Sequence, residues 1–181
     1  MVIAVLGQTD KRPVIYCLMK LLQKLGDCAI VTKERHYARL IDNGTNVGHF
    51  QNIFIAVTDA NTDEIFSEIG YRVEDFENII IDCLDQIPEY ADVTIYVGGA
   101  GGKTEDEEIL LETCGEYFTI NLGFGDKNIP YKVEMFKCIE EVEGLKHLGP
   151  MDPQIASRIG TILTDRIHMP VKNIVKVVCA K

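Results

Sequence analysis

The stretch MVIAVLGQTDKRPVIYCLMKLLQKLGDCAIVT (residues 1–32) decides the fold class. Its first apolar run, VIAVL, is short and continuous, as in a strand that is buried on both faces. Apolar residues then recur at helical spacing from Val14 to Leu25, and Gly26 ends the helix. The run CAIVT follows as a second strand. A strand, a helix and another strand in this order are typical of a parallel sheet with helical connections.

The same alternation continues along the rest of the chain. We expect further strands at 52–57, 78–82, 93–97 and 117–122, a short strand near 145–148, and helices at about 37–40, 62–69, 105–114, 133–142, 155–167 and 171–178. The apolar stripe of the helix at 133–142 consists of Val133, Phe136, Ile139 and Val142. Because the strands are continuously apolar, both faces of the sheet must be covered. The sequence therefore predicts a single α/β domain over residues 1–181: a doubly wound, mainly parallel sheet of about six or seven strands with helices on both faces.

Composition limits the kinds of partner. The 181 residues carry a net charge of −10 with a pI of about 4.8, which disfavours nucleic acid or an anionic membrane as the main partner. The six cysteines are scattered without a CxxC pair, and the four histidines lack the spacing of a zinc site. This pattern is typical of free thiols in a reducing compartment, so we expect a cytoplasmic protein. The apolar N-terminus lacks a basic segment and is interpreted as a strand rather than a signal peptide.

The segment VGGAGGKTEDEE (97–108) is similar to a phosphate-binding loop, because glycines precede Lys103 and Thr104 at the start of a helix. It is one residue short of the usual GxxxxGK[ST] spacing, and four acids fill the first helical turn. A capping box explains the same residues, with the Thr104 hydroxyl accepting from the Glu107 amide and the Glu107 carboxylate accepting from the Thr104 amide. We therefore interpret the segment as a capped helix start and not as a phosphate site.

In a parallel sheet, ligands bind beyond the carboxyl ends of the strands. Three segments with polar residues follow strand ends and reach that edge: 7–13, 82–88 and 121–126. Any small-molecule site of this chain is expected there.

The order of motifs along the chain resembles the MinD/ParA-type P-loop ATPases. The strand, loop and long helix of residues 1–25 are followed by FENIIIDCLDQIP (76–88), ADVTIYVGGAGGKTEDEEILLE (91–112), FTINL (118–122) and LKHLGPMDPQIA (145–156), in the order of that family. The resemblance implies a site for ATP or ADP with Mg²⁺. Its residues would be Asp82 on the metal side, Gly7, Thr9, Lys11 and Arg12 in the phosphate loop, and Asn121, Pro150 and Asp152 beside the base.

Several residues depart from the family pattern. The loop after Gly7 is QTDKRP, without further glycines or a Gly-Lys-Thr sequence, and Asp10 places a carboxylate where phosphates would lie. The Ser or Thr that would ligate Mg²⁺ is missing unless Thr9 substitutes for it. The second strand ends Thr32-Lys33-Glu34 instead of with an Asp that orients water. The resemblance thus implies an atypical member with a degenerate Walker A loop, similar to TadZ-like localisation proteins.

Three functions remain open at this point. The first is a scaffold that acts through protein contacts and positions cellular machinery, with weak or no hydrolysis and no catalytic residue. The second is a module that holds ATP or ADP without efficient turnover. The third is a divergent ATPase or kinase that uses the 98–104 loop, for which Asp126 is the candidate carboxylate. Outside any nucleotide role, Lys11 and Arg12 are interpreted as solvated loop cations, and Asp82 as a cap of the following turn.

The resemblance also implies protein partners and a homodimer across the nucleotide edge, with no nucleic acid. The chain ends KNIVKVVCAK, which places Lys172, Lys176 and Lys181 opposite an apolar stripe. Such a helix can contact a membrane surface, but packing on the sheet is the interpretation we favour.

Overall fold

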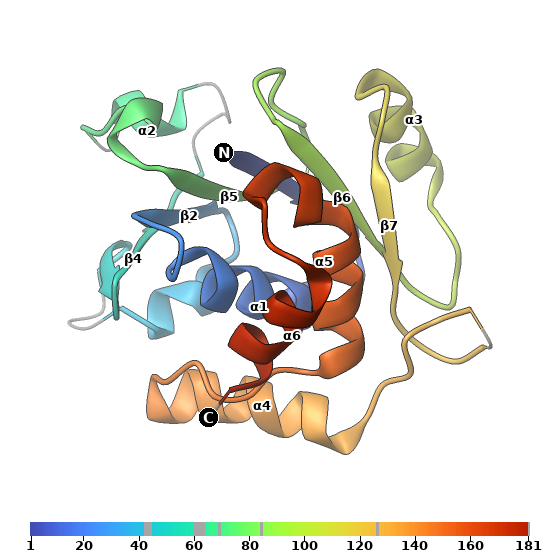
Figure 1. Cartoon of the computed structure of the whole chain (residues 1–181). Coiled ribbons are helices and arrows are strands. Elements are labelled where there is room, and N and C mark those ends of the chain that lie inside the picture. The colour runs from blue at the N-terminus through green and yellow to red at the C-terminus, as the bar shows by residue number, and fades with distance from the viewer. Residues whose placement is uncertain (42–44, 60–63, 69, 84, 126, 181) are drawn as a thin grey trace.

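The computed structural model describes residues 1–41, 45–59, 64–68, 70–83, 85–125 and 127–180 (Figure 1). In chain order the elements are β1 (Val2–Leu6), α1 (Arg12–Leu22), β2 (Cys28–Thr32), the 3-10 helix η1 (Arg35–Arg39), β3 (Val47–Phe50), β4 (Ile53–Val57), α2 (Ile65–Glu68), the 3-10 helix η2 (Val73–Asp75), β5 (Asn78–Asp82), β6 (Val93–Gly98), α3 (Glu105–Thr113), β7 (Phe118–Asn121), α4 (Val133–Leu145), α5 (Pro153–Ile167) and α6 (Val171–Cys179).

The strands form one seven-stranded sheet in the order β3-β4-β2-β5-β1-β6-β7. All neighbouring strands are parallel except β3 and β4, which are antiparallel. The predicted α/β class with a mainly parallel sheet is therefore confirmed. In the centre, Asp82 at the end of β5 stands opposite Val5 of β1 on one side and Thr32 of β2 on the other. This register brings three strand ends and the loop after β1 together at the carboxyl edge.

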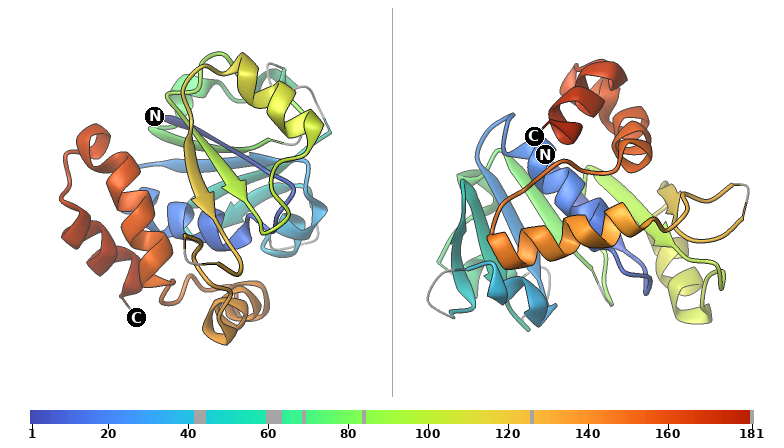
Figure 2. Two further views of the ribbon diagram at one scale, coloured as in Figure 1. Left: turned by 90° about the vertical axis from the view of Figure 1, so that its right-hand side faces the viewer. Right: turned by 90° about the horizontal axis from the view of Figure 1, so that it is seen from below.

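Helices cover both faces of the sheet, as continuously apolar strands require. Strand residues such as Ile3 face the larger core, to which α1, α4, α5 and α6 contribute. Strand residues such as Ala4 face a smaller core that includes Phe66 of α2 and Leu111 of α3. Figure 2 shows the α5–α6 pair on one side of the sheet and α3 on the other.

Some local predictions differ from the structure. Residues 145–148 form no strand, because α4 continues to Leu145 and ends where Lys146 adopts a left-handed conformation with φ 51°. The sequence pattern does not predict the edge strand β3, because Gly48 and the exposed His49 interrupt its apolar residues. The helix expected at 62–69 corresponds to α2. Residues 62, 63 and 69 of that range lie outside the described residues.

The buried stripe of α4 also differs from the predicted one. Ile139 and Val142 are buried as predicted, but Val133 and Phe136 are 64% and 47% exposed. Met135 is buried instead, because residues 135, 139 and 142 are spaced i, i+4 and i+7 and so form the stripe that faces the core. The first turn of α4 therefore presents apolar side chains to solvent.

The C-terminal helix α6 packs on the body of the protein. Its Ile174 and Val178 are fully buried in the larger core, so the apolar stripe packs inside the protein. Its main neighbours are α5 and α1 rather than the sheet on which we expected it to pack. Lys172 and Lys176 are exposed, and Lys181 lies outside the described residues. Within the described parts of the chain, no helix combines the length and the apolar composition that a membrane crossing needs.

Gly7 directly follows β1, at a position where a side chain would not fit. Its φ is +129°, and a Cβ atom added there would lie inside the contact distance of the Val97 carbonyl oxygen in β6. The glycine is thus explained by close packing of two neighbouring strands, independently of any phosphate.

We predict that Gly7→Ala lowers the unfolding free energy by about 1–3 kcal/mol or more, because a strained backbone and a backbone clash are combined. Urea unfolding followed by circular dichroism measures this loss. Gly101→Ala is the matched control, since nothing lies within 4 Å of a Cβ at Gly101, and its effect should stay within about 0.5 kcal/mol. Equal effects of the two variants would contradict the packing role of Gly7.

Candidate functional site

The carboxyl edge of the sheet contains a cavity of about 590 Å³ beside the loop between β1 and α1. Its lining residues come from that loop, from the segment after β2 and from the end of β5: Gly7, Gln8, Thr9, Asp10, Lys11, Arg12, Glu34, His36, Tyr37 and Asp82. Five of the eight residues that the family resemblance singles out are therefore brought together. Asn121, Pro150 and Asp152 do not line this cavity.

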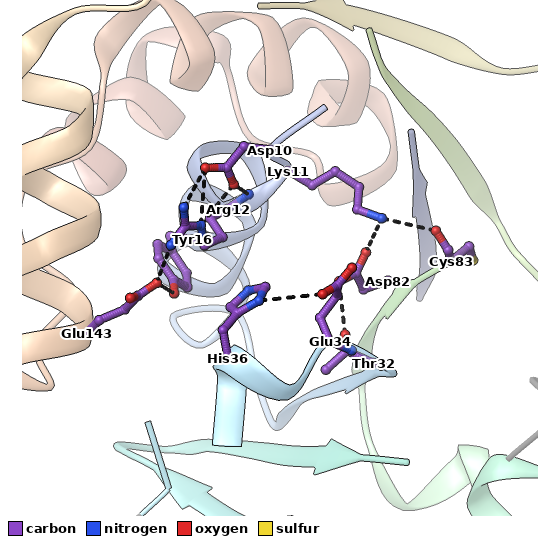
Figure 3. Close-up of polar contacts among 10 residues, drawn as sticks. All are labelled: Asp10, Lys11, Arg12, Tyr16, Thr32, Glu34, His36, Asp82, Cys83 and Glu143. Atoms are coloured by element: carbon purple, nitrogen blue, oxygen red, sulfur yellow. Dashed lines mark hydrogen bonds and ion pairs between the residues drawn. The ribbon is translucent and has the colours of Figure 1, made fainter. Parts of the chain in front are cut away.

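Asp82 is a buried carboxylate in the cavity wall (Figure 3). Its Oδ1 lies 2.7 Å from Lys11 Nζ in an ion pair whose side chains are 1% and 6% exposed. Its Oδ2 accepts a hydrogen bond of 2.9 Å from the Thr32 hydroxyl, and Lys11 Nζ also donates to the Cys83 carbonyl at 3.1 Å. Burial raises the pKa of Asp82, while the Lys11 ammonium and the Thr32 hydroxyl oppose that rise. Both oxygens that would face a metal ion thus have partners from the protein.

Arg12 is held by two carboxylates. Its Nε donates to Asp10 Oδ1 at 2.9 Å and its terminal NH2 nitrogen donates to Asp10 Oδ2 at 2.7 Å, in a bidentate pair. Its other terminal nitrogen donates to Glu143 Oε1 at 2.9 Å, and the Tyr16 hydroxyl donates to the same oxygen at 3.1 Å. Burial raises the pKa of Asp10, but the hydrogen bonds and charge of Arg12 hold that pKa below its usual value. Arg12 therefore ties the loop to α1 and to α4.

The first turn of α1 satisfies its own amides. The Arg12 amide donates to Asp10 Oδ1 at 3.1 Å, Pro13 has no N–H, and the Val14 and Ile15 amides donate to the Lys11 carbonyl at 3.0 and 2.9 Å. An anion site at a helix N-terminus depends on amides that point at the anion without an internal partner. The amides of residues 12, 14 and 15 already have partners within the protein, so they do not meet this condition.

Glu34 and His36 form the opposite wall of the cavity. The Glu34 carboxylate is 40% exposed and lies 3.7 Å from His36 Nδ1, while the Glu34 amide donates to the Thr32 hydroxyl at 3.0 Å. The His36 ring packs against Tyr37 with a centroid distance of 4.1 Å. Burial lowers the pKa of His36, and the nearby Arg12 charge lowers it further, which favours the neutral ring.

This set of groups is a poor match for a Mg²⁺–triphosphate. The cavity is lined by three carboxylates, Asp10, Glu34 and Asp82, and by two cations that are both paired with carboxylates. A triphosphate would meet Glu34 and the engaged Asp10 before it met an unpaired cation. Within the described residues, no group of three His, Cys, Asp or Glu side chains is arranged to hold a metal ion.

The glycine-rich segment after β6 supports the loop after β1. The predicted capping box at Thr104 and Glu107 is confirmed, with the Thr104 amide donating to Glu107 Oε2 at 2.8 Å. Glu107 Oε1 accepts from the Gln8 amide at 2.8 Å, so the buried carboxylate joins α3 to the cavity loop. Lys103 Nζ lies 2.6 Å from the Tyr117 hydroxyl and over the ring of the same tyrosine. Burial raises the pKa of Glu107, but hydrogen bonds from the Thr104 and Gln8 amides lower it below its usual value.

The three residues expected beside a base lie elsewhere along the edge. Asn121 ends β7 and its Oδ1 lies against Gly98 of β6. Asp152 caps α5 by accepting from the Gln154 amide at 2.8 Å, and Lys132 approaches it to 3.4 Å. The Pro150 carbonyl accepts from the Cys138 thiol at 3.3 Å. Asp126, the candidate carboxylate of the kinase hypothesis, lies outside the described residues.

Sequence reasoning missed the residues from helices that hold the cavity loop in place. Glu143 binds Arg12 and also accepts from the Tyr16 hydroxyl, which is 127 residues away in the chain, and no motif marks Glu143 or Tyr16. The sequence places Glu34 just after β2, but its place in the cavity wall depends on the fold of the segment that leads into η1. One weak sequence signal is Tyr16, which stands in an apolar stripe of a helix. A tyrosine hydroxyl that is buried in this way needs a hydrogen-bond partner.

The sequence matches no protein-family model, and no curated protein matches it. Among solved structures, the chain is similar to the MinD cell division protein of Aquifex aeolicus, at 14% identity and a TM-score of 0.49, covering 98% of this chain and 94% of that one. It is similar to the same organism's MinC:MinD complex at 12% identity and a TM-score of 0.48, with coverages of 98% and 93%. A plasmid partition protein of Borrelia burgdorferi bound to AMPPNP gives 12% identity, a TM-score of 0.46 and coverages of 97% and 97%.

We predict that Asp82→Leu and Lys11→Met each lower the unfolding free energy by about 3–5 kcal/mol, because each leaves one buried charge without its partner. The double variant should recover most of the loss, since it buries no charge. Urea unfolding measures all three values. Lys33→Met and Asp85→Leu are the controls. This pair is nearly as close, at 2.8 Å, but Asp85 is 63% exposed, so each change should cost less than about 1 kcal/mol. If the double variant at residues 11 and 82 loses as much unfolding free energy as the two single variants together, the two charges do not stabilise each other and the prediction is wrong.

We expect the Glu107 carboxylate to make the free energy of unfolding depend on pH. Its pKa in the folded protein is lowered from the ordinary 4.5. The stability that it contributes is therefore complete above 4.5 and is lost as the pH falls through the lower pKa of the folded protein. We predict that Glu107→Gln costs about 0.5–2 kcal/mol at neutral pH and that its difference from wild type disappears in acid. Urea unfolding from pH 7 downwards measures the difference, with the exposed Glu108→Gln as control. A difference that persists at the lowest pH would contradict the role of the charge.

Proposed function

We propose that this chain is a degenerate MinD/ParA-like protein that acts as a protein-interaction or positioning scaffold, with weak or no nucleotide hydrolysis. The observation that carries the proposal is the buried ion pair between Lys11 and Asp82. In the order of motifs, Lys11 stands where a group that binds phosphate is expected, and Asp82 stands where a group that binds a metal ion is expected. The ion pair engages these two groups with each other.

The energetics of this pair support the proposal. A ligand that took Lys11 would leave Asp82 as an unpaired charge with 1% exposure, which is strongly unfavourable. Arg12 could turn to a phosphate only by leaving Asp10 and Glu143 together. Nucleotide binding would therefore have to exceed the loss of three internal ion pairs, and hydrolysis would still lack a group to orient water.

A second candidate is a module that holds ATP or ADP without turnover. The observation in its favour is the cavity itself, whose volume of about 590 Å³ is in the range of ligand sites and which lies at the carboxyl edge. In this case Lys11 and Arg12 exchange their carboxylate partners for phosphates, and Asn121 and the segment at Pro150–Asp152 bind the base. A divergent ATPase or kinase based on the 98–104 loop has less support, because Lys103 is engaged by Tyr117.

Protein partners, and a homodimer across the carboxyl edge, belong to the same proposal. Their basis is the motif resemblance together with a cavity whose two cations are already paired with carboxylates of the chain. Such a site can persist as a rigid part of the scaffold, because an ion pair holds the loop between β1 and α1 against α4 and a hydrogen bond holds it against α3.

Thermal unfolding with about 1 mM ATP or ADP, with and without Mg²⁺, tests the proposal. We expect no shift of Tm, whereas a nucleotide with a Kd of about 10 µM would raise Tm by about 5–10 °C through mass action. The double variant of Lys11→Met with Asp82→Leu is the matched control, because it removes both site charges without leaving either one alone. A shift in wild type that the double variant lacks would favour the second candidate.

Turnover is the second measurement. We expect phosphate release at the background rate in wild type and in Asp82→Ala alike. Metal-dependent release well above background in wild type, lost in folded Asp82→Ala, would overturn the scaffold proposal. Lys103→Ala is included because a loss specific to that variant would instead support the kinase alternative.

A further inference from the structure

The charge of the chain is distributed very unevenly. Residues 153–181 contain five Lys or Arg residues and a single acid, Asp165, which gives them a net charge of +4. Because the whole chain has a net charge of −10, residues 1–152 carry −14. Most of the basic segment forms the α5–α6 hairpin, so the protein presents a basic helical hairpin on an acidic body.

The cations of the hairpin are exposed. Lys172 and Lys176 follow each other at i, i+4 on α6, and Arg158 and Arg166 lie on α5. Arg158 donates to the Thr119 carbonyl and Arg166 lies over the Phe118 ring, so neither meets a carboxylate. Within the described residues, no ion pair includes any of these four side chains. Their charge is therefore available to an acidic surface.

The matching acidic surface is on α3. Glu105, Glu108 and Glu112 are exposed and lie within one face of the helix, together with Ile109, which is 57% exposed. Asp106 adds a further exposed carboxylate beside them. In the described parts of the chain, none of these four carboxylates is in an ion pair. The α3 surface thus combines unpaired negative charge with an apolar centre.

The two surfaces lie on opposite faces of the sheet. Leu111 anchors α3 in the smaller core, whereas Ile159 and Ile174 anchor α5 and α6 in the larger one. Figure 2 shows the same arrangement, with the sheet between the α5–α6 hairpin and α3. The surfaces therefore cannot meet within one molecule, but they can meet between two.

We propose that a second copy of this chain docks head to tail, with the acidic face of α3 on one copy against the basic α5–α6 hairpin of the next. The occupant follows from charge complementarity. The acids of α3 from Glu105 to Glu112 span seven residues, or about 10 Å, and Arg158 and Arg166 on α5 span eight residues, or about 12 Å. The contact is heterologous, because each copy uses two different surfaces. Each docked copy leaves one surface of each kind free, so the assembly grows into an open chain.

The expected contact is weak and sensitive to salt. Exposed ion pairs contribute little individually, and the Debye length falls from about 30 Å at 0.01 M salt to about 3 Å at 1 M. Neither surface includes a cavity residue, so the contact does not depend on the nucleotide question. Failure of this proposal therefore leaves the scaffold proposal untouched, and the reverse also holds.

Sedimentation of the full chain without nucleotide tests the contact. We expect the weight-average mass to rise with protein concentration in about 0.02 M NaCl and to fall in about 0.5 M to no more than that of a homodimer, twice the chain mass of 20.3 kDa. Two double variants each cancel the charge of one surface: Lys172→Glu with Lys176→Glu, and Glu108→Lys with Glu112→Lys. Each alone should lose the low-salt association, because the four charges of the changed surface then sum to zero.

In a mixture of the two double variants, the unchanged α3 face of one can bind the unchanged hairpin of the other, so we expect the mixture to have a higher mass than either variant alone. Lys24→Glu with Lys137→Glu is the matched control for the hairpin variant, since it changes the net charge by the same amount at other exposed positions and should still associate at low salt. The proposal is wrong if the mass of wild type does not rise at low salt, if this control also loses the low-salt association, or if the mixture has no higher mass than its separate variants. It is also wrong if wild type that does not associate at low salt binds phosphatidylglycerol vesicles or a DNA duplex through the hairpin, because a different polyanion is then the occupant.

Discussion

The buried ion pair between Lys11 and Asp82 is the constraint on which the carboxyl edge depends. Two charges removed from water are tolerated only when each has a close partner and further hydrogen bonds. The sheet register supplies these conditions, because β5 lies between β1 and β2 and so brings Asp82 beside Thr32 and below the loop that carries Lys11. The Cys83 carbonyl accepts from the same ammonium and completes the arrangement.

The loop around this pair is held from both faces of the sheet. On one face, Arg12 connects Asp10 to Glu143 of α4. On the other, Glu107 of α3 accepts from the Gln8 amide while it caps its own helix. A phosphate loop needs free amides and a free cation. Here the same structural elements use amides, cations and carboxylates to bind one another, and this internal pairing is the physical basis of the scaffold role that we propose.

Sequence patterns predicted the large elements and missed features that depend on a neighbour. Continuous apolar runs such as 2–6 and 78–82 indicate buried parallel strands, and they are found as such. The capping box at Thr104 is local and was also predictable. The stripe of α4 was assigned to Val133 and Phe136, because the apolar pattern alone does not tell which of two adjacent helical faces meets the core. The strand β3 was missed because Gly48 and the exposed His49 interrupt its apolar residues, and pairing with β4 stabilises it nonetheless.

For the site, the sequence alone determined that Asp10, Lys11, Arg12 and Asp82 stand at strand ends, because parallel strands place their following loops at one edge. It also determined the excess of acids and their separation from the basic C-terminal segment. Only the tertiary structure decided which charges meet: Lys11 with Asp82, and Arg12 with Asp10 and Glu143. The reason is physical. An ion pair depends on distances of a few ångströms between side chains, and those distances are set by strand register and helix packing, which local sequence does not encode.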